Sequence, residues 1–102
     1  MISVKVSYTV KAEYVVQNKQ NISAFLADFK KLSTAGFLCN VYLQQDGLTF
    51  LHISMYESEE VQTLVLNVPS FLKFQSERDE IGLANEPEIT YLDLVGSSLS
   101  LI

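Results

Sequence analysis

The only histidine of the sequence, His52, is the side chain best suited to acid–base chemistry near neutral pH, because its ordinary pKa lies there. It belongs to the stretch FLHISMY, where it alternates with Phe50, Ser54 and Tyr56. A histidine beside an aspartate or a tyrosine can act as a general base on a phenolic substrate. The competing hypothesis is structural: a histidine that is hydrogen-bonded inside a subunit interface.

The other reactive groups favour structural roles. Cys39 alternates with Val41 and Leu43, which predicts a buried thiol that packs as a small hydrophobic side chain. One cysteine and one histidine are too few for a Cys/His zinc site, and no histidine accompanies the acidic runs at 59–60 and 77–80. No glycine-rich phosphate loop is present. We therefore expect no metal and no cofactor.

Length and charge exclude further classes of function. The 102 residues fit a single domain, residues 1–102, with one core. A net charge of −5 argues against sequence-independent binding of nucleic acid, which requires a cationic surface. The first residues do not resemble a signal peptide, and no apolar run approaches the roughly 18 residues of a membrane span. These features predict a cytoplasmic protein that binds neither nucleic acid nor membrane.

The first half of the chain predicts a strand, a helix and a hairpin. Residues 2–10 alternate with period two, which predicts a half-buried strand. From Glu13 to Ala35 the apolar residues follow helical spacing, and Gly36 is well placed to cap the helix. Residues 37–45 and 48–56 read as two strands around Asp46-Gly47, which predicts a hairpin with a type I′ turn.

The second half predicts a broken helix and a last strand. Ser58 is predicted to be an N-cap, and Pro69 ends one helix and starts the next, which has Phe71, Phe74 and Ile81 on its inner face. Residues 88–96 read as the final strand. The resulting order, β-α-β-β-α-β with the second helix broken at Pro69, predicts an α+β, ferredoxin-like fold: a four-stranded antiparallel sheet with helices on one face.

Pleating sorts the strand residues into two faces. The set expected to pack against the helices is apolar: Val4, Val6, Tyr8, Cys39, Val41, Leu43, Leu51, Ile53, Met55, Leu92 and Leu94. The set expected on the open face is polar and aromatic: Lys5, Ser7, Thr9, Asn40, Tyr42, Gln44, Phe50, His52, Ser54, Tyr56, Tyr91 and Asp93.

Three interpretations of this open face compete. A solvated face leaves the aromatic rings unexplained, and an RNA-binding platform conflicts with the acidic charge and the lack of Lys or Arg around the rings. We favour a homodimer in which two sheets pack face to face around a partly polar cavity, because tyrosine rings suit such an interface.

The stretch FLHISMYESEEVQTLVLNVPSFLKF, residues 50–74, resembles the antibiotic-biosynthesis-monooxygenase-like family of dimeric α+β barrel proteins. The resemblance implies a homodimer, and either cofactor-independent oxygenation of quinol-like aromatics, haem degradation or no catalysis. Haem-degrading members use an asparagine, a tryptophan and a histidine. This chain has no tryptophan, no asparagine within residues 2–10, and Val65 at or beside the position of the helix-borne histidine. Quinol-oxygenating members also rely on a tryptophan, so its absence here also weakens the expectation of quinol oxygenation that the resemblance implies.

These observations together predict a homodimer that is monooxygenase-like, or that binds a small molecule, and needs no cofactor. The alternative is a non-catalytic dimerisation or ligand-sensing module. The expected ligand is a small aromatic molecule, and the expected catalytic residue is His52. The residues expected to form the pocket or interface around it are Lys5, Ser7, Asn40, Tyr42, Phe50, Ser54, Tyr56, Tyr91 and Asp93. The hydrophobic tail residues Leu99, Leu101 and Ile102 are left without an assigned role.

Overall fold

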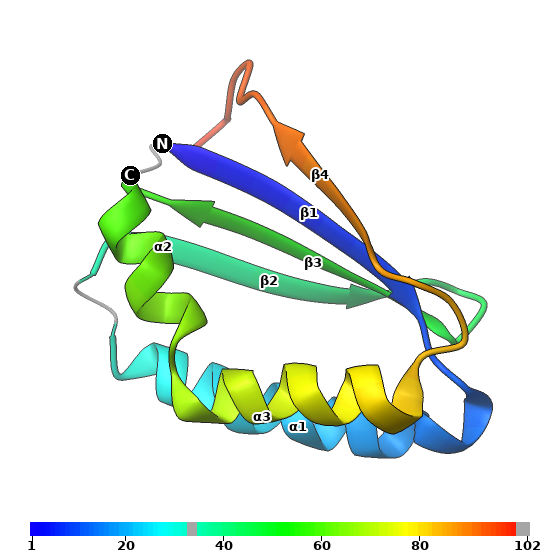
Figure 1. The fold of residues 1–102 in the computed structure, drawn as a ribbon. Helices are drawn as coiled ribbons and strands as arrows, with labels where there is room; N and C mark the ends of the chain where they lie inside the picture. Colours follow the sequence, from blue (N-terminus) through cyan, green and yellow to red (C-terminus); the bar gives the residue numbers. More distant parts are fainter. Residues whose placement is uncertain (33–34, 100–102) are drawn as a thin grey trace.

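A four-stranded antiparallel sheet carries helices on one of its faces (Figure 1). The computed structural model describes residues 1–32 and 35–99. The strands, in the spatial order β2-β3-β1-β4, are β1 (Ile2–Thr9), β2 (Phe37–Leu43), β3 (Thr49–Tyr56) and β4 (Glu88–Leu92). The helical elements are η1 (Ala12–Tyr14), α1 (Val15–Lys30), α2 (Glu59–Leu66), α3 (Pro69–Glu77) and the π turn η2 (Arg78–Gly82). This order confirms the ferredoxin-like α+β prediction.

The hairpin between β2 and β3 is confirmed, but its predicted turn type is wrong. Of the described residues, only Gly36 and Gly47 have a positive φ, so Asp46 does not adopt the conformation that a type I′ turn requires. The loop is longer, and the carboxylate of Asp46 accepts hydrogen bonds from the backbone N–H groups of Leu48 and Thr49, each at 2.9 Å. Such side-chain bonds stabilise a wider loop that needs only one left-handed residue.

The helix boundaries follow most of the predicted signals. The Ser58 hydroxyl accepts a hydrogen bond from the N–H of Val61 at 3.2 Å, and Pro69 is the first residue of α3, as predicted. In contrast, α1 ends at Lys30, well before the predicted end at Ala35. Gly36 does not cap it. Its carbonyl accepts a hydrogen bond from the N–H of Glu57 at 2.9 Å, next to the start of β2.

Strand register corrects the predicted faces of β3. Val4 pairs with Ser54, Val6 with His52 and Tyr8 with Phe50, and residues directly opposite each other in an antiparallel pair share a face. The even-numbered residues of β3 therefore point toward the helices with the core residues of β1. Phe50, His52, Ser54 and Tyr56 are all buried.

The same correction applies to β4, where Tyr91 pairs with Val4 and faces the helices. The open face instead carries an apolar set, which was predicted to be the core side of β3 and β4: Leu51, Ile53, Met55 and Leu92. The physical reason is bulk, because burying the rings of Phe50 and Tyr56 removes more apolar surface from water than burying the aliphatic residues beside them.

The core between sheet and helices is mainly aromatic. Phe25 of α1 is fully buried, and its ring centroid lies 4.9 Å from that of Phe74 and 5.1 Å from that of Phe71. Phe71 and Phe74 are core residues, as predicted, but Ile81 is 55% exposed. The π turn explains this difference, because its wider turn rotates Ile81 outward and brings Gly82 to the buried side.

No helix within residues 1–32 and 35–99 is long and apolar enough to cross a membrane.

Candidate functional site

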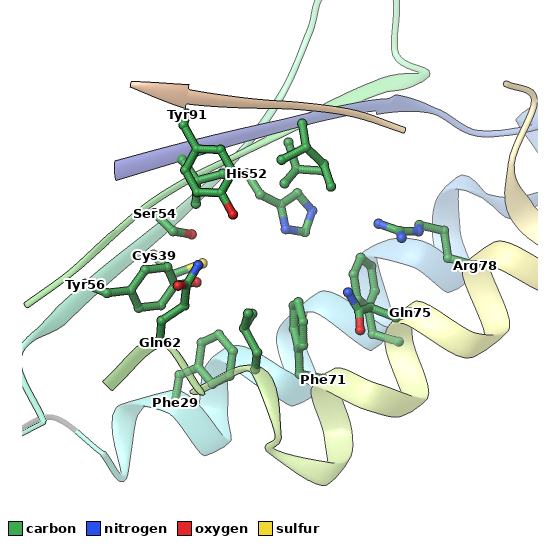
Figure 2. Close-up of a pocket in the computed structure, with 15 residues that line it drawn as sticks. Phe29, Cys39, His52, Ser54, Tyr56, Gln62, Phe71, Gln75, Arg78 and Tyr91 are labelled. Atoms are coloured by element: carbon green, nitrogen blue, oxygen red, sulfur yellow. The ribbon is translucent and has the colours of Figure 1, made fainter. Parts of the chain in front are cut away.

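A cavity of about 150 Å³ lies between the sheet and the helices α2 and α3 (Figure 2). The sheet side is formed by small and aliphatic residues that include Val4, Val6 and Cys39. The aromatic part of its wall is formed by Phe29, Tyr56, Phe71, Phe74 and Tyr91. The polar side chains that border it are His52, Ser54, Gln62, Gln75 and Arg78. The cavity is therefore an aromatic pocket with a few polar groups, as is usual for small-molecule sites.

The structure divides the predicted site residues into two groups. His52, Ser54, Tyr56 and Tyr91 line the cavity on the helix side, so their predicted place on the open face is wrong. Phe50 is also on the helix side, where its ring stacks on Tyr8 with centroids 5.7 Å apart.

The second group lies away from the cavity. Lys5, Ser7, Asn40 and Tyr42 are on the open face, as predicted. Asp93 is exposed and lies just beyond β4. The structure therefore brings His52 together with Tyr91 but separates both from Tyr42.

His52 projects from β3 into the space between the sheet and the helices, and it is 6% exposed. Its ring stacks on Phe74, with centroids 5.4 Å apart. Burial, and to a smaller extent the positive charge of Arg78, lowers the pKa of His52 to about 3. The imidazole is therefore neutral at physiological pH, and its Nε2 lies 2.7 Å from the hydroxyl of Tyr8.

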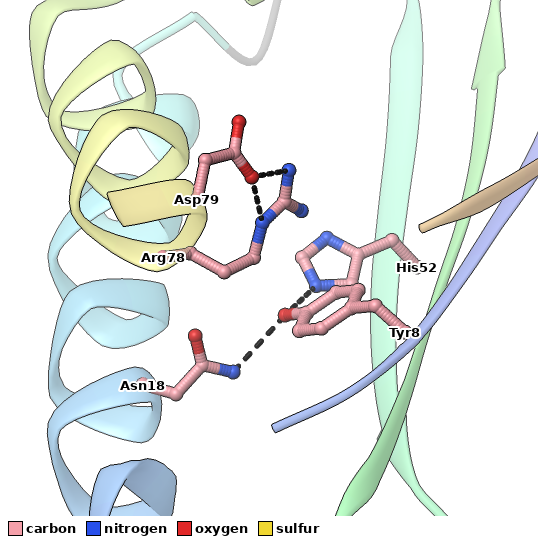
Figure 3. A network of polar contacts seen from close by, with 5 residues as sticks. All are labelled: Tyr8, Asn18, His52, Arg78 and Asp79. Atoms are coloured by element: carbon pink, nitrogen blue, oxygen red, sulfur yellow. Dashed lines mark hydrogen bonds and ion pairs between the residues drawn. The ribbon is translucent and has the colours of Figure 1, made fainter. Parts of the chain in front are cut away.

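Tyr8 and Asn18 extend this contact into a buried chain of hydrogen bonds (Figure 3). Asn18 of α1 donates from Nδ2 to the Tyr8 hydroxyl at 3.0 Å, and neither residue is more than 1% exposed. Burial raises the pKa of Tyr8 to about 12, although the Asn18 hydrogen bond and the Arg78 charge oppose the rise. The chain Asn18–Tyr8–His52 thus links α1, β1 and β3 through groups that are neutral at pH 7.

Arg78, the only arginine of the sequence, is 6% exposed at the start of the π turn η2. Its guanidinium carbon lies 4.8 Å from the ring centroid of Tyr8 and 5.1 Å from that of Phe74. Its Nε donates to Oδ1 of Asp79 at 3.0 Å, and its Nη2 forms an ion pair with the same oxygen at 2.9 Å. This single carboxylate oxygen leaves further N–H donors of Arg78 available beside the cavity.

Sequence reasoning missed three of these residues: Tyr8, Asn18 and Arg78. A signal for Arg78 exists, because it follows Phe71 and Phe74 of α3 at helical spacing and so continues their inner face. No such signal exists for the hydrogen bond between Tyr8 and Asn18, because this bond depends on how α1 crosses β1.

The remaining groups at the cavity offer little independent chemistry. Burial raises the pKa of the Cys39 thiol, so the thiol stays protonated and is a poor nucleophile. Val65 is fully buried in α2 and packs in the core. Within the described part of the chain, no group of three His, Cys, Asp or Glu side chains is placed to hold a metal ion. The charge at the cavity therefore comes from Arg78 and the imidazole from His52, while Ser54, Gln62 and Gln75 add uncharged hydrogen-bonding groups.

No protein-family model matches the sequence, and no curated protein matches it. Solved structures do match. They include Rv0793 from Mycobacterium tuberculosis, with a TM-score of 0.80 and 14% identity over 96% of this chain and 98% of that chain.

Two further structures carry descriptions of activity. An antibiotic biosynthesis monooxygenase matches with a TM-score of 0.78 and 12% identity, over 94% of this chain and 100% of that chain. A variant of SnoaB from Streptomyces nogalater, described as a cofactor-independent oxygenase, matches with a TM-score of 0.73 and 13% identity, over 97% of each chain. At these identities the similarity shows the fold. The chain has the fold of antibiotic biosynthesis monooxygenase-like proteins, as the resemblance of residues 50–74 implied.

Proposed function

We propose that this protein binds a small, single-ring phenolic molecule in the cavity and oxygenates it without a cofactor, as a monooxygenase-like enzyme. The observation that carries the proposal is the cavity itself, which combines aromatic walls with a buried neutral histidine and a buried arginine. The fold supports it, because one structure with this fold is described as a cofactor-independent oxygenase.

The size of the cavity sets the size of the ligand. A cavity of about 150 Å³ lined by apolar side chains is large enough for a benzene ring. Fused ring systems need a larger space. Phe29, Phe71 and Phe74 offer edges and faces for ring contacts, which favour an aromatic ligand over an aliphatic one of equal volume.

The polar groups suit a phenolic oxygen. The positive charge of Arg78 favours the phenolate form of a bound phenol, and a phenolate ring is rich enough in electrons to react with oxygen. In the proposed reaction, a phenol with a free para C–H reacts with one O₂. One oxygen atom becomes the second carbonyl of a para-quinone, and the other leaves as water with the para and hydroxyl hydrogens. The phenol supplies all four electrons, so no external reductant is needed.

We propose in addition that the protein is a homodimer that pairs through the open face of the sheet. This face carries an apolar set from β2, β3 and β4: Leu38, Leu51, Ile53, Met55 and Leu92. Leu38 and Leu92 are 42% and 41% exposed in the single chain. An apolar patch of this kind on a sheet face is typical of an interface.

A ligand-binding module without catalysis is the second candidate, and the pKa of His52 favours it. A histidine with a pKa of about 3 is a weak base for a phenolic proton at pH 7. The Cys39 thiol, whose pKa is raised by burial, does not replace it. On this hypothesis the cavity would hold its ligand unchanged, and binding would be the whole function.

Binding and oxygen uptake together test these proposals. We expect phenol to raise the melting temperature of the wild-type protein in a concentration-dependent way, as a ligand of the folded state must. Cys39→Phe places a ring in the cavity and should abolish this effect, whereas Leu38→Phe, one residue away on the opposite face, should preserve it. An oxygen electrode then measures turnover.

The outcomes separate the two functions. Consumption of one O₂ for each phenol converted supports the oxygenase. Phenol binding without any oxygen uptake supports the binding module and contradicts the oxygenase. If no single-ring phenol shifts the melting temperature, or if Cys39→Phe responds like the wild type, the cavity is not the binding site.

A further inference from the structure

The buried chain Asn18–Tyr8–His52 determines where the single proton of the neutral imidazole lies. Hydrogen bonds join the Tyr8 oxygen to Nδ2 of Asn18 at 3.0 Å and to Nε2 of His52 at 2.7 Å, and the cationic Arg78, which cannot accept a hydrogen bond, lies nearby. An amide NH₂ group can only donate, so the Tyr8 oxygen accepts from Asn18. The hydroxyl hydrogen of Tyr8 then has Nε2 of His52 as its acceptor.

The reverse arrangement is less favourable. If the Nε2–H group of His52 donated to Tyr8, the hydroxyl hydrogen of Tyr8 would have no acceptor while Nδ2 of Asn18 faces it. Turning the Asn18 amide around would supply an acceptor, but it would move the buried NH₂ group to the position where the carbonyl oxygen now has no hydrogen-bond partner among the described residues. In the observed orientation, the carbonyl oxygen of Asn18 is the one fully buried side-chain N or O atom among the described residues that has no hydrogen bond. A buried carbonyl tolerates this better than a buried N–H group does.

The consequence is that His52 carries its proton on Nδ1. His52 lines the cavity, and Nδ1 makes no hydrogen bond to any of the described residues. Arg78 lines the same cavity with further N–H donors, and it packs against the same two rings, Tyr8 and Phe74, as His52 does. Two donors therefore border one small cavity, and one of them carries a full positive charge.

We propose that Asn18 and Tyr8 are positioning residues that fix His52 in its Nδ1–H tautomer, so that His52 and Arg78 bind an anionic oxygen of the ligand. This proposal rests on the proposed binding of a single-ring aromatic molecule and specifies its polar group. The oxygen is that of a phenolate or a carboxylate, since both accept hydrogen bonds and carry a negative charge. His52 acts as a hydrogen-bond donor to the ligand and takes no proton from it.

Nitrogen NMR of the imidazole tests the tautomer directly, because a chain with one histidine gives one pair of imidazole nitrogen signals. In the ligand-free wild type we expect Nδ1 to be protonated and Nε2 to be the acceptor. Tyr8→Phe removes the donor to Nε2 and should shift the tautomer population toward Nε2–H. Tyr14→Phe is the matched control, since Tyr14 is also buried but its hydroxyl bonds to Glu77, away from His52.

Binding of three small probes tests the ligand group. We expect benzoate, or 4-nitrophenolate above the pKa of its hydroxyl, to bind at least about tenfold more tightly than the neutral analogue benzyl alcohol. In Tyr8→Phe this preference should fall by about fivefold or more, because Nδ1 becomes an acceptor that repels the anion. Tyr14→Phe should keep the preference of the wild type.

The outcomes distinguish this proposal from the one on which it rests. An Nε2–H tautomer in the wild type, or an unchanged tautomer in Tyr8→Phe, overturns the role of Asn18 and Tyr8 whether or not any ligand binds. Equal affinity for benzoate, 4-nitrophenolate and benzyl alcohol overturns the anionic oxygen but leaves the aromatic site intact. Failure of all three probes to bind contradicts the aromatic site itself. Preference for only one of the two anions identifies the oxygen as a carboxylate or a phenolate.

Discussion

Val6 of β1 and His52 of β3 lie directly opposite each other, so the only histidine of the chain faces the helices together with a core valine. This pairing determines which residues of β3 point toward the helices and which point to the open face. His52, Ser54 and Tyr56 of β3 border the cavity, while the leucine, isoleucine and methionine of this strand lie on the open face. The proposed ligand site and the proposed pairing surface therefore lie on opposite sides of one sheet.

The buried position of His52 predicts a specific dependence of stability on pH. Its pKa is about 3 in the folded protein and about 6.5 when it is exposed, so between these values the unfolded chain binds a proton that the folded chain does not. The free energy of unfolding should therefore fall as the pH falls from 6.5 toward 3. At pH 5 the loss attributable to His52 is about 2 kcal/mol relative to neutral pH.

Urea unfolding at pH 7 and pH 5 measures this loss. His52→Gln has no titrating group at this position, so its free energy of unfolding should decrease less than that of the wild type over the same interval. An identical decrease in both proteins would show that His52 titrates normally and would contradict its burial.

Gly82→Ala should destabilise the fold by about 1–3 kcal/mol, because overpacking in a filled core forces neighbours apart. A Cβ atom at Gly82 would lie 2.5 Å from two ring carbons of Tyr14, whose ring is held by its hydroxyl bond to Glu77. Gly96→Ala is the control, since a Cβ at Gly96 meets nothing within 4 Å. Urea denaturation of the two variants gives the comparison, and equal stability would show that η2 shifts freely to make room.

Asp46→Ala should lower the urea midpoint, because three hydrogen bonds in the β2–β3 loop end on this carboxylate. The hydroxyl of Thr49 is one of the donors, at 2.7 Å, and it is the main cause of a lowered pKa for Asp46. Since the folded pKa is lowered, the stabilisation is present above the ordinary pKa of 3.8 and is lost as the pH falls below it. Gln45→Ala, the neighbouring exposed residue, should leave the midpoint unchanged. A similar midpoint for both variants would show that the hydrogen bonds to Asp46 do not contribute to stability.

Ile53→Lys should convert the proposed homodimer into a monomer. Ile53 lies near the middle of the open face, opposite Lys5 on one side and Asn40 on the other, so a second lysine there places like charges side by side in the interface. Light scattering on a sizing column should give the mass of one 11.5 kDa chain for this variant and twice that mass for the wild type. Leu64→Lys changes an exposed leucine of α2 and should keep the wild-type mass. A wild-type mass of one chain would overturn the dimer.

The order of elements was predictable because local signals fix it. Ser58 caps α2 through its own hydroxyl, and Pro69 begins α3, where its missing N–H is not needed. Neither signal depends on distant parts of the chain. The wrong turn type at Asp46 has the opposite cause. The dipeptide Asp-Gly suits several loops, and the hydroxyl of Thr49 helps to select the wider one.

The face of β3 was not predictable from hydropathy, because both alternating sets of FLHISMY are large and partly apolar. Its orientation is set by pairing with β1, so that His52 meets Val6 and Phe50 meets Tyr8. The candidate site has the same long-range character. Arg78 could have been placed by its helical spacing from Phe74, but the bond between Asn18 and Tyr8 requires the packing of α1 on the sheet.

The cavity reaches the surface beside β4, where its lining residues Ile89 and Tyr91 are 63% and 69% exposed. This opening lies on the helix side of the sheet, and the apolar patch proposed for pairing lies on the other side. In a dimer joined through that patch, each subunit would keep its own solvent-accessible entrance to the cavity. Saturation of such a dimer should then follow a simple hyperbola with a Hill coefficient of about one, and the apparent affinity should not change with protein concentration.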